Sequence, residues 1–298
     1  MLSPIAYSSD TRDNVINGLI YTNTTSPLTQ TIVACVLIFI QALIINYIFS
    51  NQKISRENTL FAGVFYILFI SLVTENNVLS PVLIANTFML LAIKNIMDTQ
   101  LNTEASAPIF NAGFLLGTAA LIYTPFLGFV LYGIIALNML RAFKFQELLQ
   151  FLIGVSIPYF LLFTYKYWND MPFVEFDVFN ELFLSIPSFH ADSMFMLYIA
   201  VGMLTLMLLF SLVNYSNITS KKSVQAKKKI NLMYWYILFC VLTFLGFRTD
   251  HLEHLSSLAI PMGILVGISA SESQRKLSYE LVHILLITIV FAGYFKLF

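Results

Sequence analysis

The strongest constraint on this chain is a succession of long apolar segments that are almost free of charge. A helix that crosses the hydrocarbon core of a membrane needs ~20 mostly apolar residues. Nine or ten such segments follow one another along the 298 residues. Their approximate bounds are 30–50, 59–74, 80–96, 109–123, 125–141, 147–166, 192–214, 231–247, 255–271 and 279–295. The composition supports the same class, since 58% of the residues are apolar and 11% are charged, against ~45–50% and ~25% in soluble domains. The sequence therefore predicts an all-α fold, a polytopic transmembrane helical bundle of nine to ten spans.

The number of spans depends on the stretch 109–141, which is apolar throughout. We divide it at "IYTPFLG", because Pro125 lacks a backbone N–H donor and because Tyr123 and Thr124 suit a turn at the membrane surface. The segment 59–74 is short for a span, at sixteen residues.

Basic residues gather in alternate loops, which sets the orientation, because Lys and Arg are retained on the cytoplasmic side of short loops. Twelve of the sixteen basic residues lie in those loops, and the opposite side collects ten of the sixteen acidic residues. The twelve are Lys53, Arg56, Lys94, Arg141, Lys144, Lys221, Lys222, Lys227, Lys228, Lys229, Arg275 and Lys276. With ten spans, both termini face outward. The first residues lack a signal-peptide pattern, and we expect no cleavage there.

The domain organisation that follows is simple. Residues 1–29 form an outer N-terminal segment, and residues 30–298 form a single transmembrane domain. Its outer loop 166–191 has phenylalanines at intervals of three and four residues and acids on the other side, which predicts an amphipathic helix on the outer surface. Its basic loop 215–230 is expected to be a cytoplasmic anchor attracted to anionic headgroups. The alternative for this loop is a nucleic-acid or protein partner.

Familiar catalytic motifs do not occur in the sequence. There is no Walker loop, GxGxxG, HExxH or Cys-x-x-Cys pattern, and Cys35 and Cys240 lie inside apolar segments as small core residues. We therefore expect no metal site, and the sequence names no cofactor. A net charge of zero gives no support to a nucleic-acid partner, and none is expected. His283 is the only ionisable candidate within the spans, which disfavours a proton-coupled transporter.

The polar cluster "RTDHLEH" stands out between the eighth and ninth segments, at the outer boundary of the membrane. In a helix, Asp250 and His254 would share one face, and Arg248 and His251 a neighbouring one. A planar guanidinium suits a phosphate, because it binds oxygens in pairs. A carboxylate beside a histidine can orient the ring or act as a base near neutral pH. The alternative is a solvated loop whose charged side chains extend from helix ends.

Two further outer clusters complete a candidate site. Asp10, Arg12 and Asp13 lie in the N-terminal segment, and Lys166 and Trp168 begin the long outer loop. Together with the first cluster they would form an outward-facing polar bowl, similar by analogy to membrane enzymes that act on polyprenyl-phosphate-linked sugars. The candidate catalytic residues are Asp250, His251, His254, Asp10 and Asp13, and the candidate substrate-binding residues are Arg248, Arg12, Lys166 and Trp168. Each cluster taken alone also fits ordinary polar decoration of the membrane interface.

A family resemblance accompanies these patterns. The stretch "IFNAGFLLGTAALIYTPFLGFVLYGIIALNMLRAFKFQELLQFLIGVSIPYFLLFTYKYW" resembles an uncharacterised family of polytopic inner-membrane proteins from Bacteroidota. The stretches "SPVLIANTFMLLAIKNIMD" and "DHLEHLSSLAIPMGILVG" are similar to the same family, so the resemblance extends from about residue 75 to the C-terminus. It implies a multi-pass protein of the bacterial inner membrane, and the charge bias described above then makes both termini periplasmic.

The resemblance also points to individual residues. These are Asn111, Arg141 and Glu147 on the cytoplasmic side, and His254 and Pro261 on the outer side. Asn111 stands where the family pattern has an acidic residue, which weakens any proposal of an essential carboxylate there. Arg141 and Glu147 flank a tight inner loop, and their simplest interpretation is an ion pair between neighbouring helices.

Two classes of function remain open. The first is an enzyme or carrier that handles a polyprenyl-phosphate- or lipid-linked envelope precursor at the periplasmic face. The second is a non-catalytic membrane subunit of an envelope machine for secretion, gliding motility or glycan assembly. The expected partners are membrane lipids, together with a lipid-linked substrate in the first class or other membrane subunits in the second. The two classes differ in whether the three outer clusters converge.

Overall fold

The computed structural model describes residues 27–52, 54, 60–71, 79–100, 104–142, 144–170, 222–246 and 252–272, with single positions between 202 and 220 and between 284 and 288. Within these residues every regular element is a helix. They are α2 (Pro27–Asn51), α3 (Phe61–Ser71), α4 (Pro81–Asp98), α5 (Ser106–Ile122), η2 (Thr124–Gly128), α6 (Phe129–Leu140), α7 (Phe145–Trp168), α10 (Val224–Gly246), η3 (Leu252–Leu258) and α11 (Ala259–Glu272). The prediction of an all-α fold is confirmed for the described chain.

Five of the described helical segments are long and apolar enough to cross a membrane. They are Leu28–Asn51, Pro81–Asp98, Phe145–Trp168, Val224–Gly246 and His254–Ser271. Three shorter apolar segments, Phe61–Ser71, Ser106–Ile122 and Thr124–Leu140, coincide with three other expected spans. The two remaining segments, 192–214 and 279–295, lie almost entirely outside the described residues. The total of nine to ten spans therefore stays a prediction, as does the amphipathic helix of the outer loop, of which only Lys166 to Asp170 are described.

The division of the stretch 109–141 is confirmed. Helix α5 ends at Ile122, and Tyr123 has an extended backbone, with φ −133° and ψ 101°. A short 3-10 helix, η2, follows with Pro125 in its first turn, where the missing N–H leaves no hydrogen bond unmade. Helix α6 then begins at Phe129. The apolar stretch thus holds two helices, and the break falls at the turn residues.

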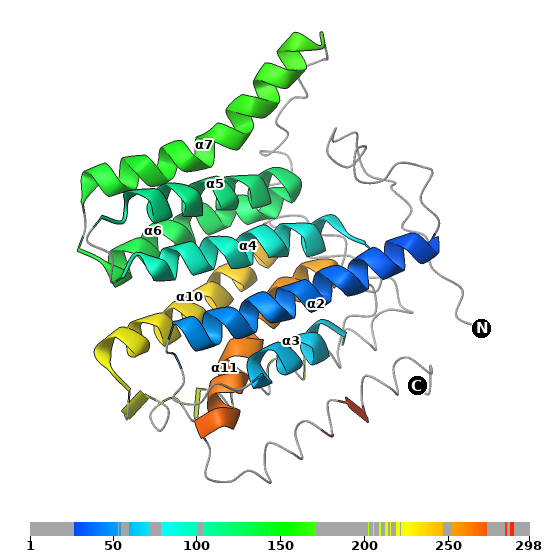
Figure 1. Cartoon of the computed structure of the whole chain (residues 1–298), viewed down its shortest axis with the longest axis vertical. Coiled ribbons are helices and arrows are strands. Elements are labelled where there is room, and N and C mark those ends of the chain that lie inside the picture. The colour runs from blue at the N-terminus through cyan, green and yellow to red at the C-terminus, as the bar shows by residue number, and fades with distance from the viewer. Residues whose placement is uncertain are drawn as a thin grey trace. The chain divides into compact units, whose positions relative to one another are not determined.

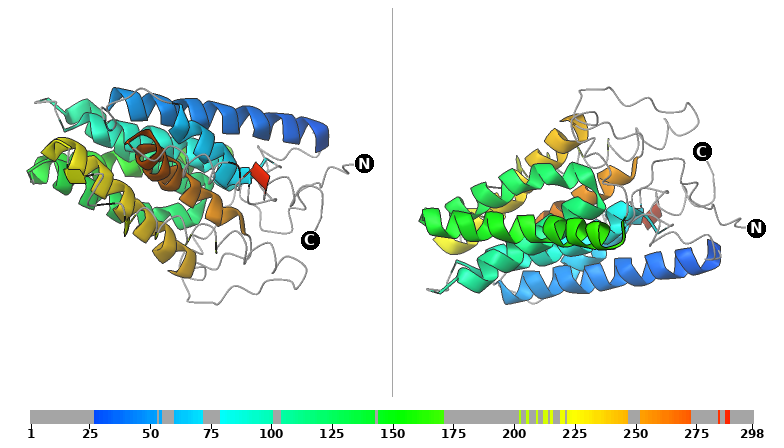
Figure 2. Two further views of the ribbon diagram at one scale, coloured as in Figure 1. Left: turned by 90° about the horizontal axis from the view of Figure 1, so that it is seen from below. Right: turned by 90° about the horizontal axis from the view of Figure 1, so that it is seen from above.

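The chain divides into two compact units, which are described separately. The first consists of Met1–Leu37, Val78–Ile186 and Val241–Arg248, and the second of Ile38–Asn77, Pro187–Cys240 and Thr249–Phe298. Helices α2 and α10 each contribute to both units, and Figures 1 and 2 show α2 as one continuous helix.

In the first unit, helix α5 packs between α4 and α7. The contact between α5 and α7 is a close approach of two backbones. A side chain at Gly113 would overlap the carbonyl group of Phe151, and one at Gly154 would meet the carbonyl oxygen of Phe110 at 2.5 Å. Small residues let membrane helices approach in this way, since dispersion contacts and not the hydrophobic effect hold them together. The second half of α7, after Pro158, diverges from α5 (Figure 1).

In the second unit, α11 packs against α3 and η3. Of the window His254–Ser271, 83% of the residues are buried. Two side-chain hydrogen bonds join α2 to α3. The hydroxyl of Tyr66 donates to Oε1 of Gln41, and the backbone N–H of Gly63 donates to Oδ1 of Asn46 over 2.8 Å. Both amide oxygens thus accept a hydrogen bond within apolar surroundings, where an unpaired polar group would be costly.

The outward faces of the spans are apolar. On α2, large aliphatic and aromatic side chains such as Leu28, Phe39 and Tyr47 are more than half exposed. On α7, only 22% of the residues in the span window are buried. Exposed apolar surface of this extent is unusual for a water-soluble protein and is what a helix in lipid presents. Cys35, predicted to be a core residue, is exposed on α2, whereas Cys240 is buried as predicted.

Candidate functional site

Most members of the predicted outer site lie outside the described residues. These are Asp10, Arg12 and Asp13 of the N-terminal segment, and Arg248, Asp250 and His251 of the loop after α10. Three members are described: His254 in η3, and Lys166 and Trp168 at the end of α7. Convergence of the three outer clusters therefore stays a prediction.

His254 lies in the packed interior of the second unit, with 1% of its surface exposed. Its Nε2 atom is 3.3 Å from the backbone carbonyl oxygen of Cys240, on α10. The hydroxyl of Ser257 donates to the backbone carbonyl of His254 over 2.7 Å, and lies 3.4 Å from Sγ of Cys240. These three residues tie the start of η3 back to α10. The imidazole thus contributes a contact between two elements, and its predicted catalytic role stays a prediction.

Lys166 and Trp168 belong to the last turns of α7, in the first unit. Helix α7 continues through them to Trp168, whereas the sequence placed them in the outer loop. Lys166 is 6% exposed and Trp168 is 84% exposed, so the two side chains lie in opposite surroundings. The exposed indole is the more accessible of the two for a ligand. Asp170, two residues further on, has a positive φ of 49° and marks the turn after the helix.

The ion pair predicted between Arg141 and Glu147 is present. Nη2 of Arg141 donates to Oε1 of Glu147 over 3.0 Å, and Nε donates to Oε2 over 3.2 Å. The Nη1 group also donates to the backbone carbonyl of Thr99, at the C-terminal end of α4, over 2.6 Å. A bidentate pair that also binds a helix-end carbonyl fixes the turn between α6 and α7 against α4. Asn111, which the resemblance also indicated, is exposed on α5.

The basic segment is partly helical, because α10 begins at Val224, within the predicted loop 215–230. The hydroxyl of Ser223 accepts a hydrogen bond from the backbone N–H of Ala226, as an N-terminal helix cap does. Lys229 is buried, and its Nζ donates to Oε1 of Gln52 over 2.7 Å. Lys222 donates to the backbone carbonyl of Ile54. Two of the five lysines therefore bind residues that follow the C-terminal end of α2.

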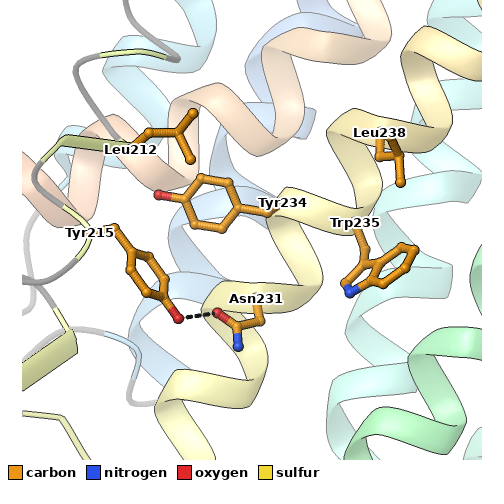
Figure 3. A pocket seen from close by; sticks show the side chains of 6 residues that line it. All are labelled: Leu212, Tyr215, Asn231, Tyr234, Trp235 and Leu238. Carbon is orange, nitrogen blue, oxygen red and sulfur yellow. Dashed lines mark hydrogen bonds between the residues drawn. The ribbon is translucent and has the colours of Figure 1, made fainter.

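A groove of about 380 Å³ lies beside α10, and the sequence analysis did not predict it (Figure 3). Asn231, Tyr234, Trp235 and Leu238 of α10 line it, together with Leu212 and Tyr215. The hydroxyl of Tyr215 donates to Oδ1 of Asn231 over 2.6 Å. The rings of Tyr215 and Tyr234 meet edge to face, with centroids 5.6 Å apart. One wall of the groove could have been predicted from the sequence, because the four α10 residues are spaced at intervals of three and four and so share one side of the helix.

Metal binding has no support among the described residues, which contain no group of three or more His, Cys, Asp or Glu side chains close enough to hold an ion.

Comparison with other proteins gives one match. No curated protein and no solved structure is similar to this chain. The sequence pattern of one family, described as a family of unknown function, matches residues 15–298. The predicted membership of an uncharacterised family is confirmed by this match, whereas an origin in Bacteroidota stays a prediction. The chain therefore belongs to the DUF6427 family.

Proposed function

We propose that this chain is a multi-pass protein of the bacterial inner membrane that handles a lipid-linked phosphate precursor of the cell envelope at the periplasmic face. The observation that carries the proposal is that η3, which follows the polar residues Arg248, Asp250 and His251 in the sequence, is held against α10. The ring of His254 contacts the backbone carbonyl of Cys240, and the hydroxyl of Ser257 contacts the thiol of Cys240. Ionised groups at the edge of a membrane lose part of their hydration. This loss is costly unless the groups are paired or meet a ligand.

The proposed roles follow from the chemistry of the side chains. Arg248 and Arg12 would hold the phosphate or diphosphate, and the exposed indole of Trp168 would contact the sugar or the chain beside it, whereas Lys166 is buried and is not assigned a contact with the phosphate. Asp250 and His251, with Asp10 and Asp13, would supply acid–base catalysis if the protein is an enzyme. The hydrocarbon chain of such a precursor would lie along the apolar outer faces of the spans. The buried His254 would act by holding the loop in position.

The test is a pair of substitutions at one residue. Arg248→Lys keeps the positive charge but replaces a planar fork by a point charge, so we expect folded protein at normal abundance and loss of most function. Complementation of a deletion strain, scored beside the amount of protein in the membrane, measures this. Arg275→Lys, the same substitution in a predicted cytoplasmic loop, is the matched control and should complement fully.

A second function is supported by one specific observation. The exposed aromatic and aliphatic residues on the second half of α7, among them Phe160, Tyr167 and Trp168, leave a face that another membrane subunit could cover. Full complementation by Arg248→Ala would eliminate the phosphate role and favour this non-catalytic subunit. Loss of function in Arg248→Ala and Arg248→Lys together, with both proteins present, would favour the precursor-handling role.

A further inference from the structure

The groove beside α10 has an ordered change in polarity along its helical wall. Lys227 and Lys228 precede Asn231 by four and three residues, and so lie on the same side of α10 one turn earlier. Asn231 is followed by Tyr234 and Trp235 one turn later, and by Leu238 after another. The wall thus passes from amide to aromatic to aliphatic, and the two lysines lie on the same side of the helix one turn before the wall begins.

We propose that this groove binds one phospholipid with an anionic headgroup. The two lysines would attract the headgroup phosphate, Asn231 and Tyr215 would contact the glycerol and ester region, and Trp235 and Leu238 would pack against an acyl chain. This site lies at the Lys-rich end of α10. The polar loop 248–253 lies beyond the other end of α10, so the two proposals stand independently.

The dimensions of the groove fit this ligand. The ten steps from Lys228 to Leu238 rise ~15 Å along a helix axis, which reaches from a headgroup through the interface into the hydrocarbon. A volume of about 380 Å³ accommodates part of a lipid and not a whole protein helix. Tyr and Trp favour this depth in membrane proteins, because their rings are apolar while their O–H and N–H groups bind polar partners.

The hydrogen bond within the groove orients the amide group of Asn231. Because Oδ1 of Asn231 accepts from the Tyr215 hydroxyl, the Nδ2 group of the same amide points away from that ring (Figure 3). An NH₂ group can donate two hydrogen bonds, which suits ester or phosphate oxygens. The walls are accessible from outside the protein, since Trp235 is 39% exposed and Leu238 is 46% exposed.

Charge complementarity favours an occupant with an anionic end. The first turns of α10 carry three consecutive lysines, and the positive end of the helix dipole lies there too, so both favour an anion. Two of those lysines, Lys227 and Lys228, are partly exposed, whereas Lys229 is buried against Gln52. The exposed pair is therefore available to a headgroup.

The experiment uses the intrinsic fluorescence of the full chain. The sequence has two tryptophans, so Trp168→Phe leaves Trp235 as the only indole. The protein is reconstituted in phosphatidylcholine bilayers that contain a small fraction of brominated lipid, either phosphatidylglycerol or phosphatidylcholine, since bromine quenches an indole in contact with it. We expect brominated phosphatidylglycerol to compete for the groove more strongly, by about fivefold for each lysine that contacts it.

Two variants make the result specific. Lys227→Gln with Lys228→Gln should abolish the preference for the anionic lipid while the protein stays folded and Trp235 stays quenchable by both lipids. Lys144→Gln, which removes an exposed lysine that is not part of the groove, should leave the preference unchanged. Equal quenching by the two brominated lipids in the parent protein, or an unchanged preference in the double variant, would overturn the proposal. Displacement of the brominated anionic lipid by inorganic phosphate would also overturn the proposal, in favour of a soluble phosphate compound. If neither lipid quenched Trp235, the proposal would be overturned in favour of a groove covered by protein.

Discussion

Polar side chains within the described spans mostly bind the main chain of their own helix. The hydroxyls of Ser71, Thr118, Thr164 and Ser269 each donate to the carbonyl four residues earlier. This satisfies a hydroxyl in apolar surroundings without a second helix. His254 differs, because its ring contacts the carbonyl of Cys240, fourteen residues away, on a different element. His254 thereby joins the start of η3 to α10.

Removal of that contact should destabilise the second unit. His254→Ala deletes a buried hydrogen bond and leaves a cavity, and the loss of the hydrogen bond alone should cost about 1–3 kcal/mol of unfolding free energy. Ser257→Ala should cost less, about 1 kcal/mol, because the hydroxyl is small and makes a neutral contact. Thermal unfolding of the purified protein in detergent measures both. Ser156→Ala, at an exposed hydroxyl, is the control and should change little. A melting temperature of His254→Ala equal to that of the parent would show that the ring holds nothing in place.

At the scale of elements, the packing of α5 on α7 rests on small residues at the crossing. Gly113→Leu would drive a side chain into the backbone of α7 at Phe151. The helices must then separate, and we expect the first unit to lose about 1–3 kcal/mol of stability or more. Gly202→Leu makes the same change where no atom lies within 4 Å, and it should be neutral or slightly stabilising. Thermal unfolding separates the two variants, and equal melting temperatures would contradict a tight α5–α7 contact.

The helices themselves were predictable, because the thickness of a membrane fixes how long an apolar segment must be. The break after Ile122 was predictable for a local reason, since Pro125 cannot continue the hydrogen-bond pattern of α5. The start of α10 was placed too late, at residue 231. Three lysines indicated a loop, whereas the cap at Ser223 and the burial of Lys229 against Gln52 keep that segment helical. A helix start decided by a contact 177 residues away in sequence cannot be found from local composition.

The candidate site was predictable only in part. The ionisable residues near the ends of the spans could be identified from the sequence. The ion pair of Arg141 with Glu147 was predicted correctly, because the two residues flank one short turn. It did not anticipate that His254 is buried or that Lys166 and Trp168 lie in contrasting surroundings. It also missed the groove, because Tyr215 and Leu212 reach α10 through tertiary packing, which periodicity along one helix does not reveal.

At the scale of the whole molecule, α10 joins the two proposals. Its 23 residues rise ~34 Å, close to the ~30 Å of a hydrocarbon core. The Lys-rich groove at one end and the loop 248–253 at the other would then meet opposite faces of the membrane. The orientation predicted from the basic residues would place the groove at the cytoplasmic face and the polar residues 248–253 at the periplasmic face.

The central claim is that the outer clusters converge on one site, and a cysteine crosslink between positions 12 and 251 tests it most directly. Arg12→Cys and His251→Cys are combined in a chain in which Cys35 and Cys240 are replaced by Ser, and the membranes are treated with crosslinkers of increasing length. Gln52→Cys with Lys229→Cys, a pair already in hydrogen-bond contact, is the positive control. We predict a crosslink at positions 12 and 251 with reagents that span up to ~15 Å, a length close to that of four or five extended residues. The single outer site would be contradicted by the following result. Both cysteines react with an impermeant reagent from the outside, but they do not crosslink at that length, while the control pair does.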